Sequence, residues 1–195
     1  MHVLPPVFLL VSAVIRLLGG LSYLRATIIG KAKPNPLTWL LWSITPAITL
    51  LAALSVGETD SLLVTSALAL SPLLVFVTAV IKNPRSVKFD RLNLICALLA
   101  AVGMVLWYAT SNQNLAIILA MLADFASSLP TLIKAKRQPH SEHPPAYIMS
   151  AIAMLLALLT MAHWTFTSAG FMIYILILNL IIANLSIFGR LRQVR

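Results

Sequence analysis

Two residues of opposite charge lie inside apolar stretches of this chain, where charged side chains are uncommon. Arg16 interrupts the stretch 4–29, and Asp124 interrupts the stretch 114–134. At the centre of a bilayer a charged side chain costs about 2.5–3.5 kcal/mol on insertion scales, so it usually faces a cavity or a partner. We therefore expect either a structural clamp between helices, with a direct ion pair as one form of it, or a gating or proton-coupling role. As a third arrangement, Arg16 could extend toward the membrane surface.

Four uncharged side chains within the apolar stretches join Asp124 as candidates for binding a polar solute: Asn179, Ser71, Trp42 and Thr45. Asn179 can both donate and accept hydrogen bonds, as recognition of a polar solute requires. Trp42 and Thr45 are three residues apart and share one helix face, so Trp42 could stack on a ring or cover a pocket. The alternatives are structural, because small polar residues also join helices inside membranes and Trp also anchors helices at the membrane surface.

Proline interrupts three of the apolar stretches, at Pro46, Pro72 and Pro130. Each proline removes a backbone hydrogen bond and tends to kink a helix. Such kinks can be fixed bends, or they can be hinges that open one side of a membrane protein at a time. Paired kinks at Pro46 and Pro130 would suit the rocking of two helix bundles around a central site. These two prolines therefore join Arg16 and Asp124 as candidate gating residues.

Residue patterns typical of catalysis are few. His140, Glu142 and His143 form the only cluster with metal-ligand residue types, and their loop offers no obvious third protein ligand such as Cys. The sequence contains no G-x-x-x-x-G-K-[ST] phosphate-binding motif and no visible nucleophilic triad. We therefore predict a protein that is not an enzyme and that holds no metal or cofactor. The alternative is a membrane enzyme acting on lipid, for which only this loop comes close to a catalytic site.

The elements that must position these residues are long apolar helices. Of the 195 residues, 60 % are hydrophobic and 10 % are charged, whereas soluble domains carry about 25 % charged residues. The apolar stretches are 4–29, 37–56, 61–82, 91–109, 114–134, 146–166 and 168–188. Each is near the about 20 residues that a helix needs to cross a bilayer, and about twice the length of a β-barrel strand. We predict an all-α membrane protein with seven transmembrane helices.

Basic residues follow the alternation of the gaps between these stretches. All Lys and Arg residues except Arg16 lie in or beside one alternating set of gaps: Arg25, Lys31, Lys33, Lys82, Arg85, Lys88, Arg91, Lys134, Lys136, Arg137, Arg190, Arg192 and Arg195. Basic loops stay cytoplasmic, which predicts an external N-terminus and a cytoplasmic C-terminus. The net charge of +9 therefore indicates contact with lipid headgroups rather than with nucleic acid.

An internal repeat appears when the first three stretches are set against the last three. Aligning Thr27 with Thr131 places a helix end, a basic turn and a proline-bearing segment in the same order in both copies. We therefore divide the chain into a first three-helix bundle at 1–90, a linker helix at 91–112 and a second three-helix bundle at 113–195. Parallel repeats of this kind place substrate sites between the repeats, near the middle of the membrane.

This 3+1+3 arrangement, with a proline and a basic turn after the first and fifth helices, resembles the PQ-loop class, which includes the SWEET sugar transporters, lysosomal amino-acid exporters and the KDEL receptors. The segment from Leu129 to Lys134 is similar to their Pro-Gln element, with Thr131 in place of Gln, and Ala26-Thr27 stands at the equivalent place in the first repeat. Trp39 and Trp42 are similar to the paired tryptophans of nicotinamide riboside transporters. The resemblance implies a transporter and favours a pocket-lining role for Asn179.

From these observations we expect a transporter that moves a small polar solute by alternating access. Sugars, amino acids and vitamin-like nucleosides are all open, and transport would be proton-coupled if Asp124 titrates. The alternative is a membrane receptor or assembly protein of the same architecture that binds without transport. We expect a multi-pass protein of the plasma (inner) membrane, with the solute and membrane lipids as its partners and no nucleic acid. Oligomeric state, including a homo-oligomer, stays open.

Overall fold

The computed structural model describes the chain apart from residues 1–3, 6, 56–61, 88–89, 111 and 194–195. Two of the basic residues named above, Lys88 and Arg195, therefore lie outside the described part. The described residues form seven α-helices: α1 (Val7–Ile28), α2 (Pro36–Ser55), α3 (Leu62–Lys82), α4 (Arg91–Ala109), α5 (Gln113–Arg137), α6 (Pro144–Leu159) and α7 (Phe166–Gln193). Two 3-10 turns, η1 (Pro84–Ser86) and η2 (Pro139–Ser141), precede α4 and α6, and the described residues include no strand. The all-α class and the number of helices are confirmed.

Three of the helices are long and apolar enough to cross a membrane. They are Val7–Ile28, Ile117–Arg137 and Ala169–Gln193, and shorter apolar helical segments run over Leu70–Lys82, Arg91–Leu106 and Pro144–Leu159. Large apolar side chains are also displayed outward, with Leu98 63 % exposed and Ile81 73 % exposed. Soluble proteins rarely expose wide apolar surfaces, because burying such surfaces away from water is favourable. The described helices therefore have the character of a multi-pass membrane protein.

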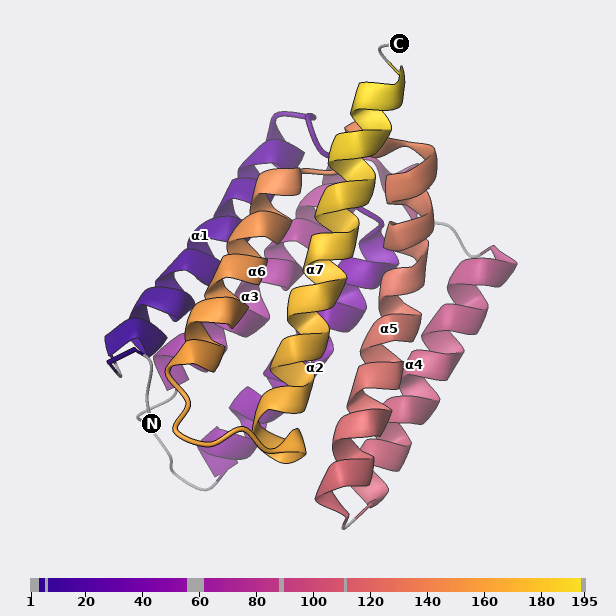
Figure 1. Ribbon diagram of the computed structural model, residues 1–195. Coiled ribbons are helices and arrows are strands. Elements are labelled where there is room, and N and C mark those ends of the chain that lie inside the picture. Colours follow the sequence, from indigo (N-terminus) through magenta and orange to yellow (C-terminus); the bar gives the residue numbers. More distant parts are fainter. Residues whose placement is uncertain (1–3, 6, 56–61, 88–89, 111, 194–195) are drawn as a thin grey trace.

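The last turns of α1, α5 and α7 carry basic side chains and lie at the same end of the molecule, at the top of Figure 1. We call this end, which also contains the starts of α2, α4 and α6, the basic end. The structure extends α5 through Lys134 to Arg137 and α7 to Gln193, beyond the predicted limits at 134 and 188. These helices can extend past the apolar stretch because their last turns place cations beside the partial negative charge of the helix C-terminus.

The helix contacts follow the same scheme in both parts of the chain. α3 packs against both α1 and α2, and α7 packs against both α5 and α6. Between the two sets, α1 packs along α6 and α2 packs against α5, while α4 packs mainly against α5 (Figure 1). If α1, α2 and α3 are matched with α5, α6 and α7 as two copies of a repeat, the contact between α1 and α6 corresponds to the contact between α5 and α2. Polar side chains on α1, α2, α5 and α6 can therefore meet at the centre.

Two adjacent glycines allow α1 to approach its neighbours on two sides. A Cβ atom on Gly19 would lie 3.1 Å from Met149 Cβ on α6, and one on Gly20 would lie 2.1 Å from Ser71 Oγ on α3. Small residues at such contacts let helix backbones come close in membranes, where the hydrophobic effect does not drive helix association. Gly20 therefore brings Ser71 next to the helix that carries Arg16.

The buried core is concentrated toward the basic end. Its members include Tyr23 of α1, Trp39 of α2, Val75 of α3, Tyr147 of α6 and Ile182 of α7, each no more than 6 % exposed. The Tyr23 ring lies 4.3 Å from the Trp39 ring and 5.8 Å from the Tyr147 ring, measured between ring centroids. Aromatic side chains from three helices thus close the molecule at this level, and the cavity described below lies next to them.

Candidate functional site

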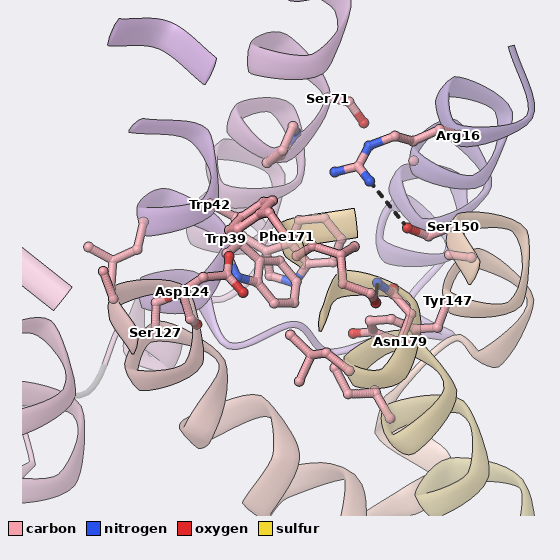
Figure 2. A pocket seen from close by; sticks show the side chains of 18 of the residues that line it. Arg16, Trp39, Trp42, Ser71, Asp124, Ser127, Tyr147, Ser150, Phe171 and Asn179 are labelled. Atoms are coloured by element: carbon pink, nitrogen blue, oxygen red, sulfur yellow. Dashed lines mark hydrogen bonds between the residues drawn. The ribbon is translucent and has the colours of Figure 1, made fainter. Parts of the chain in front are cut away.

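A cavity of about 230 Å³ lies between the helices, and Figure 2 shows the side chains around it. Its lining includes charged, hydroxyl, amide and aromatic groups from six helices: Arg16, Trp39, Trp42, Ser71, Asp124, Ser127, Tyr147, Ser150, Phe171 and Asn179. The seventh helix, α4, contributes the thioether side chain of Met104. The structure therefore brings five residues predicted from the sequence to one place: Arg16, Trp42, Ser71, Asp124 and Asn179. The volume is below the about 300–1,000 Å³ typical of pockets for drug-sized ligands, which indicates a small occupant.

Asp124 projects from α5 into this cavity and has one defined partner. The Tyr174 hydroxyl of α7 donates a hydrogen bond of 2.8 Å to Asp124 Oδ2. A carboxylate can accept several hydrogen bonds through its two oxygens, so this single bond leaves acceptor capacity facing the cavity. Sequence reasoning missed Tyr174, because a tyrosine in an apolar stretch gives no sign of which helix its hydroxyl will face.

Arg16 has only weak protein partners in the structure. Its Nη1 atom lies 3.5 Å from Ser150 Oγ and 3.9 Å from Met154 Sδ, both on α6. Among the residues that the structure describes, the ion pair within 4 Å joins Lys134 and Glu142, so the direct Arg16–Asp124 pair considered above is not formed. A guanidinium carries five N–H donors, and most of those of Arg16 remain available to an occupant of the cavity.

Arg16 and Asp124 approach the cavity from different sides. In Figure 2, Arg16 and Ser150 lie on one side of the view and Asp124 and Ser127 on the other, with Trp39, Trp42 and Phe171 drawn between them. The separation follows from the fold, because Arg16 is on α1, which packs along α6, whereas Asp124 is on α5, which packs against α7 and α2. The two charges therefore face a shared space rather than each other.

Two tryptophans from α2 form an aromatic wall of the cavity. Their ring centroids lie 5.4 Å apart in an edge-to-face arrangement. Trp39 is only 6 % exposed, so its ring packs inside the protein and does not anchor α2 at the membrane surface. The Trp42 indole N–H is buried without a hydrogen-bond acceptor among the described residues. A buried donor of this kind is costly unless a partner arrives, which makes Trp42 both a stacking surface and a donor for an occupant.

Asn179 and Ser71 complete the polar lining. Asn179 Nδ2 donates to the carbonyl oxygen of Ile175 on its own helix at 2.8 Å. One amide N–H is thus used locally, and the other N–H and the amide oxygen remain for a solute. Ser71, on α3, faces the same cavity beside Gly20.

The structure describes the side chains of two of the three prolines predicted to kink helices, Pro72 and Pro130. Pro130 is buried inside α5, on the helix that carries Asp124, and Pro72 lines the cavity from within α3. Thr45 and Pro46 fall in α2, but their side chains lie outside the part of the chain that the structure describes. Their predicted roles in binding and gating stay predictions.

A second polar cluster lies at the basic end, around the fully buried side chain of Glu142. The hydroxyls of Tyr23 and Tyr147 each donate to Glu142 Oε2 at 2.7 Å, and Lys134 Nζ lies 2.6 Å from Glu142 Oε1. We call Tyr23, Lys134, Glu142 and Tyr147 the Glu142 cluster. It joins α1, α5 and the start of α6. In the sequence, Glu142 stood out only beside His140 and His143, and nothing indicated that Tyr23, Lys134 and Tyr147 would surround it.

Backbone contacts around the Glu142 cluster tie further segments to it. Arg190 of α7 donates to the carbonyl oxygens of Pro139, at 3.1 Å, and Glu142, while the side chain of Lys134 donates to the carbonyl of Lys33. Burial lowers the pKa of His143, and the positive charge of Arg190 lowers it further. The Glu142 carboxylate is therefore engaged with Lys134 and two tyrosines. In the described part of the chain no group of three His, Cys, Asp or Glu residues could hold a metal ion.

No protein-family model, no curated protein and no solved structure matches this chain. The features of this chain that bear on its function are therefore the cavity and the Glu142 cluster.

Proposed function

We propose that this protein is a membrane transporter that moves a small polar solute across the bilayer by alternating access. The observation that carries the proposal is the central cavity, where Arg16, Asp124 and Asn179 from three different helices face one space beside Trp42. Charged groups are costly at membrane depth and usually mark a pathway or a binding site for a polar substance.

The helix contacts support an architecture of two parallel three-helix bundles, with bundle boundaries at 1–90 and 113–195 and a linker helix at 91–112. α3 lies against both other helices of the first set, and α7 lies against both other helices of the second. The contact of α1 with α6 and the contact of α2 with α5 are equivalent under the proposed repeat. A cavity between two such bundles is where transporters built from repeats place their substrate sites. The resemblance to the PQ-loop class fits this architecture.

The Glu142 cluster is suited to close the cavity on the side of the basic end. Trp39 and Tyr147 line the cavity and also belong to the packed aromatic group at the basic end, and Tyr147 donates to Glu142. Opening this side requires the bonds from Tyr23 and Lys134 to Glu142 to break, since these residues sit on different helices. Pro130 lies one turn before Lys134 on α5 and is placed to act as a hinge for that movement.

The orientation of the chain gives the first testable prediction. A reporter fused after Arg195 is expected to be cytoplasmic, because the basic end would face the cytoplasm. A fusion in the loop between α4 and α5, next to Asn112, is the matched control and is expected on the other side of the membrane. A periplasmic or luminal signal from the fusion after Arg195 would overturn the proposed topology. The Glu142 cluster would then not lie on the cytoplasmic side.

Transport itself is tested by reconstituting the purified protein in liposomes. Sugars, amino acids and nucleosides are first screened by thermal shift, and each stabilising compound is then supplied in radiolabelled form. We expect saturable uptake that is strongly reduced by Asn179→Leu, which removes the amide from the cavity. Asn184→Leu is the control, because Asn184 makes the same bond to its own helix, 2.8 Å to Leu180, but is exposed. Binding that depends on Asn179 without any uptake would favour the receptor alternative.

A further inference from the structure

We propose that the solute carried by this cavity is a small zwitterion with an apolar or planar portion, held with its anionic group at Arg16 and its cationic group at Asp124. The inference rests on the proposed function and specifies the chemical class of its substrate. Its basis is the presence of two unpaired opposite charges on different sides of one small cavity.

Arg16 forms no ion pair within 4 Å among the described residues. Its contacts to Ser150 and Met154 are long and involve uncharged atoms, at 3.5 and 3.9 Å. A guanidinium binds carboxylates through two parallel charge-assisted hydrogen bonds, and nothing in the described lining of the cavity supplies such a group within reach. An anionic group of the solute would fill this position.

Asp124 is the acidic residue of the described cavity lining. Tyr174 donates one hydrogen bond to Oδ2, which orients the carboxylate without neutralising its charge. Oxygen acceptors remain for a cationic group such as an ammonium, which carries several N–H donors. Asp124 therefore presents a negative charge on its side of the cavity, and Arg16 presents a positive charge on the other side.

The balance of charge in the cavity favours a dipolar solute. Arg16 and Asp124 together give the lining no net charge, so a solute with a single charge would pair with one of them and leave the other without a counter-charge in a low-dielectric space. Leaving a buried charge unpaired is strongly unfavourable, whereas a dipolar solute satisfies both at once. A neutral polyol could hydrogen-bond to both groups but would supply no counter-charge to either.

The remaining lining describes the rest of the solute. Trp42 and Phe171 present aromatic surfaces, and the cavity of about 230 Å³ admits only a small molecule. Aromatic surfaces favour an apolar or planar portion, which stacks on them or packs against their edges. Among common zwitterions, an amino acid with an apolar side chain has these properties.

The test compares probes that differ by one charged group. L-phenylalanine is compared with 3-phenylpropionate, which lacks the amine, with phenethylamine, which lacks the carboxylate, and with glucose. L-leucine is added as a second zwitterion. Binding is measured by thermal shift and competition on the full-length wild-type protein, and uptake is measured in liposomes. We expect at least one zwitterion to bind at least about tenfold more tightly than either single-charge analogue and than glucose.

Two variants then test which residue recognises which charge. Arg16→Gln is expected to bind phenethylamine more tightly than 3-phenylpropionate, and Asp124→Asn is expected to show the reverse preference. A residue with only a structural role would weaken all probes together and would not reverse their order. Arg25→Gln and Asp90→Asn make the same changes at exposed positions and should keep the wild-type preference.

The outcomes separate this inference from the proposed function. If glucose or a single-charge probe binds as tightly as both zwitterions, the zwitterion assignment is wrong although transport of another solute stands. If none of the five probes binds, the assignment is also wrong, and the broad uptake screen then decides the proposed function. The comparison of probes on the wild-type protein remains decisive even if a variant fails to fold.

Discussion

Glu142→Gln is expected to destabilise this protein more than the corresponding exchange at Asp90 or Asp124, the other acidic residues that the structure describes. The substitution leaves Lys134 without its counter-charge and leaves a single acceptor oxygen where Oε1 faced Lys134 and Oε2 accepted from Tyr23 and Tyr147 at 2.7 Å. Removing one partner of a buried ion pair costs about 3–5 kcal/mol. At about 2–4 °C per kcal/mol for a chain of this size, the midpoint of thermal unfolding in detergent should fall by roughly 6–20 °C.

The controls for this prediction use the same chemistry in other settings. Asp90→Asn changes an exposed carboxylate that caps α4 by accepting from the Asn93 N–H at 2.9 Å, and Asn caps helices about as well as Asp, so the midpoint should barely move. Combining Glu142→Gln with Lys134→Met should recover part of the lost stability, because no lone cation remains. An unchanged midpoint for Glu142→Gln would show that the Glu142 cluster contributes nothing to holding the basic end closed.

Asp124→Asn is expected to reduce uptake of the wild-type solute by at least about tenfold while leaving the protein folded. A hydrogen bond to a charged group contributes about 1.5–3 kcal/mol, and each 1.4 kcal/mol corresponds to a factor of ten in affinity. The fold should survive, because an amide oxygen at this position still accepts from the Tyr174 hydroxyl. Uptake at several imposed pH gradients, together with the thermal midpoint of the same sample, measures both parts of the prediction.

The pH dependence of this variant separates a coupling role from a binding role. If Asp124 carries the coupling proton, uptake by Asp124→Asn will no longer respond to a proton gradient. Tyr174→Phe is the matched control, because it removes the hydrogen bond but keeps the carboxylate, and it should weaken uptake without abolishing the response. An Asp124→Asn protein whose uptake responds to the gradient as the wild type does would exclude a coupling role for Asp124.

In the proposed transporter, different residues would close the cavity and recognise the solute. Arg16 and Asp124 face the cavity, whereas Lys134 and Glu142 lie at the basic end. Tyr147 belongs to both regions, since it lines the cavity and donates to Glu142. A solute that moves Tyr147 would therefore also disturb the Glu142 cluster, which provides a physical link between occupation of the cavity and opening of the basic end.

Hydropathy and charge alone were sufficient to predict the seven helices. An apolar stretch of about 20 residues specifies a helix in lipid, because only a helix satisfies all its backbone hydrogen bonds within one segment. The same argument made Arg16 and Asp124 stand out, since a charged side chain cannot face lipid cheaply. Both residues line the cavity.

Tertiary structure decided which groups meet. Arg16 faces Ser150 rather than Asp124, Asp124 is held by Tyr174, and Glu142 lies buried between two tyrosines and Lys134. The contacts Asp124–Tyr174, Glu142–Tyr23 and Arg16–Ser150 join residues 50 to 134 positions apart in the chain. Helical periodicity specifies the face on which a side chain lies but not which neighbouring helix that face meets. That choice depends on close approaches such as those at Gly19 and Gly20, which are set by how the helices pack together.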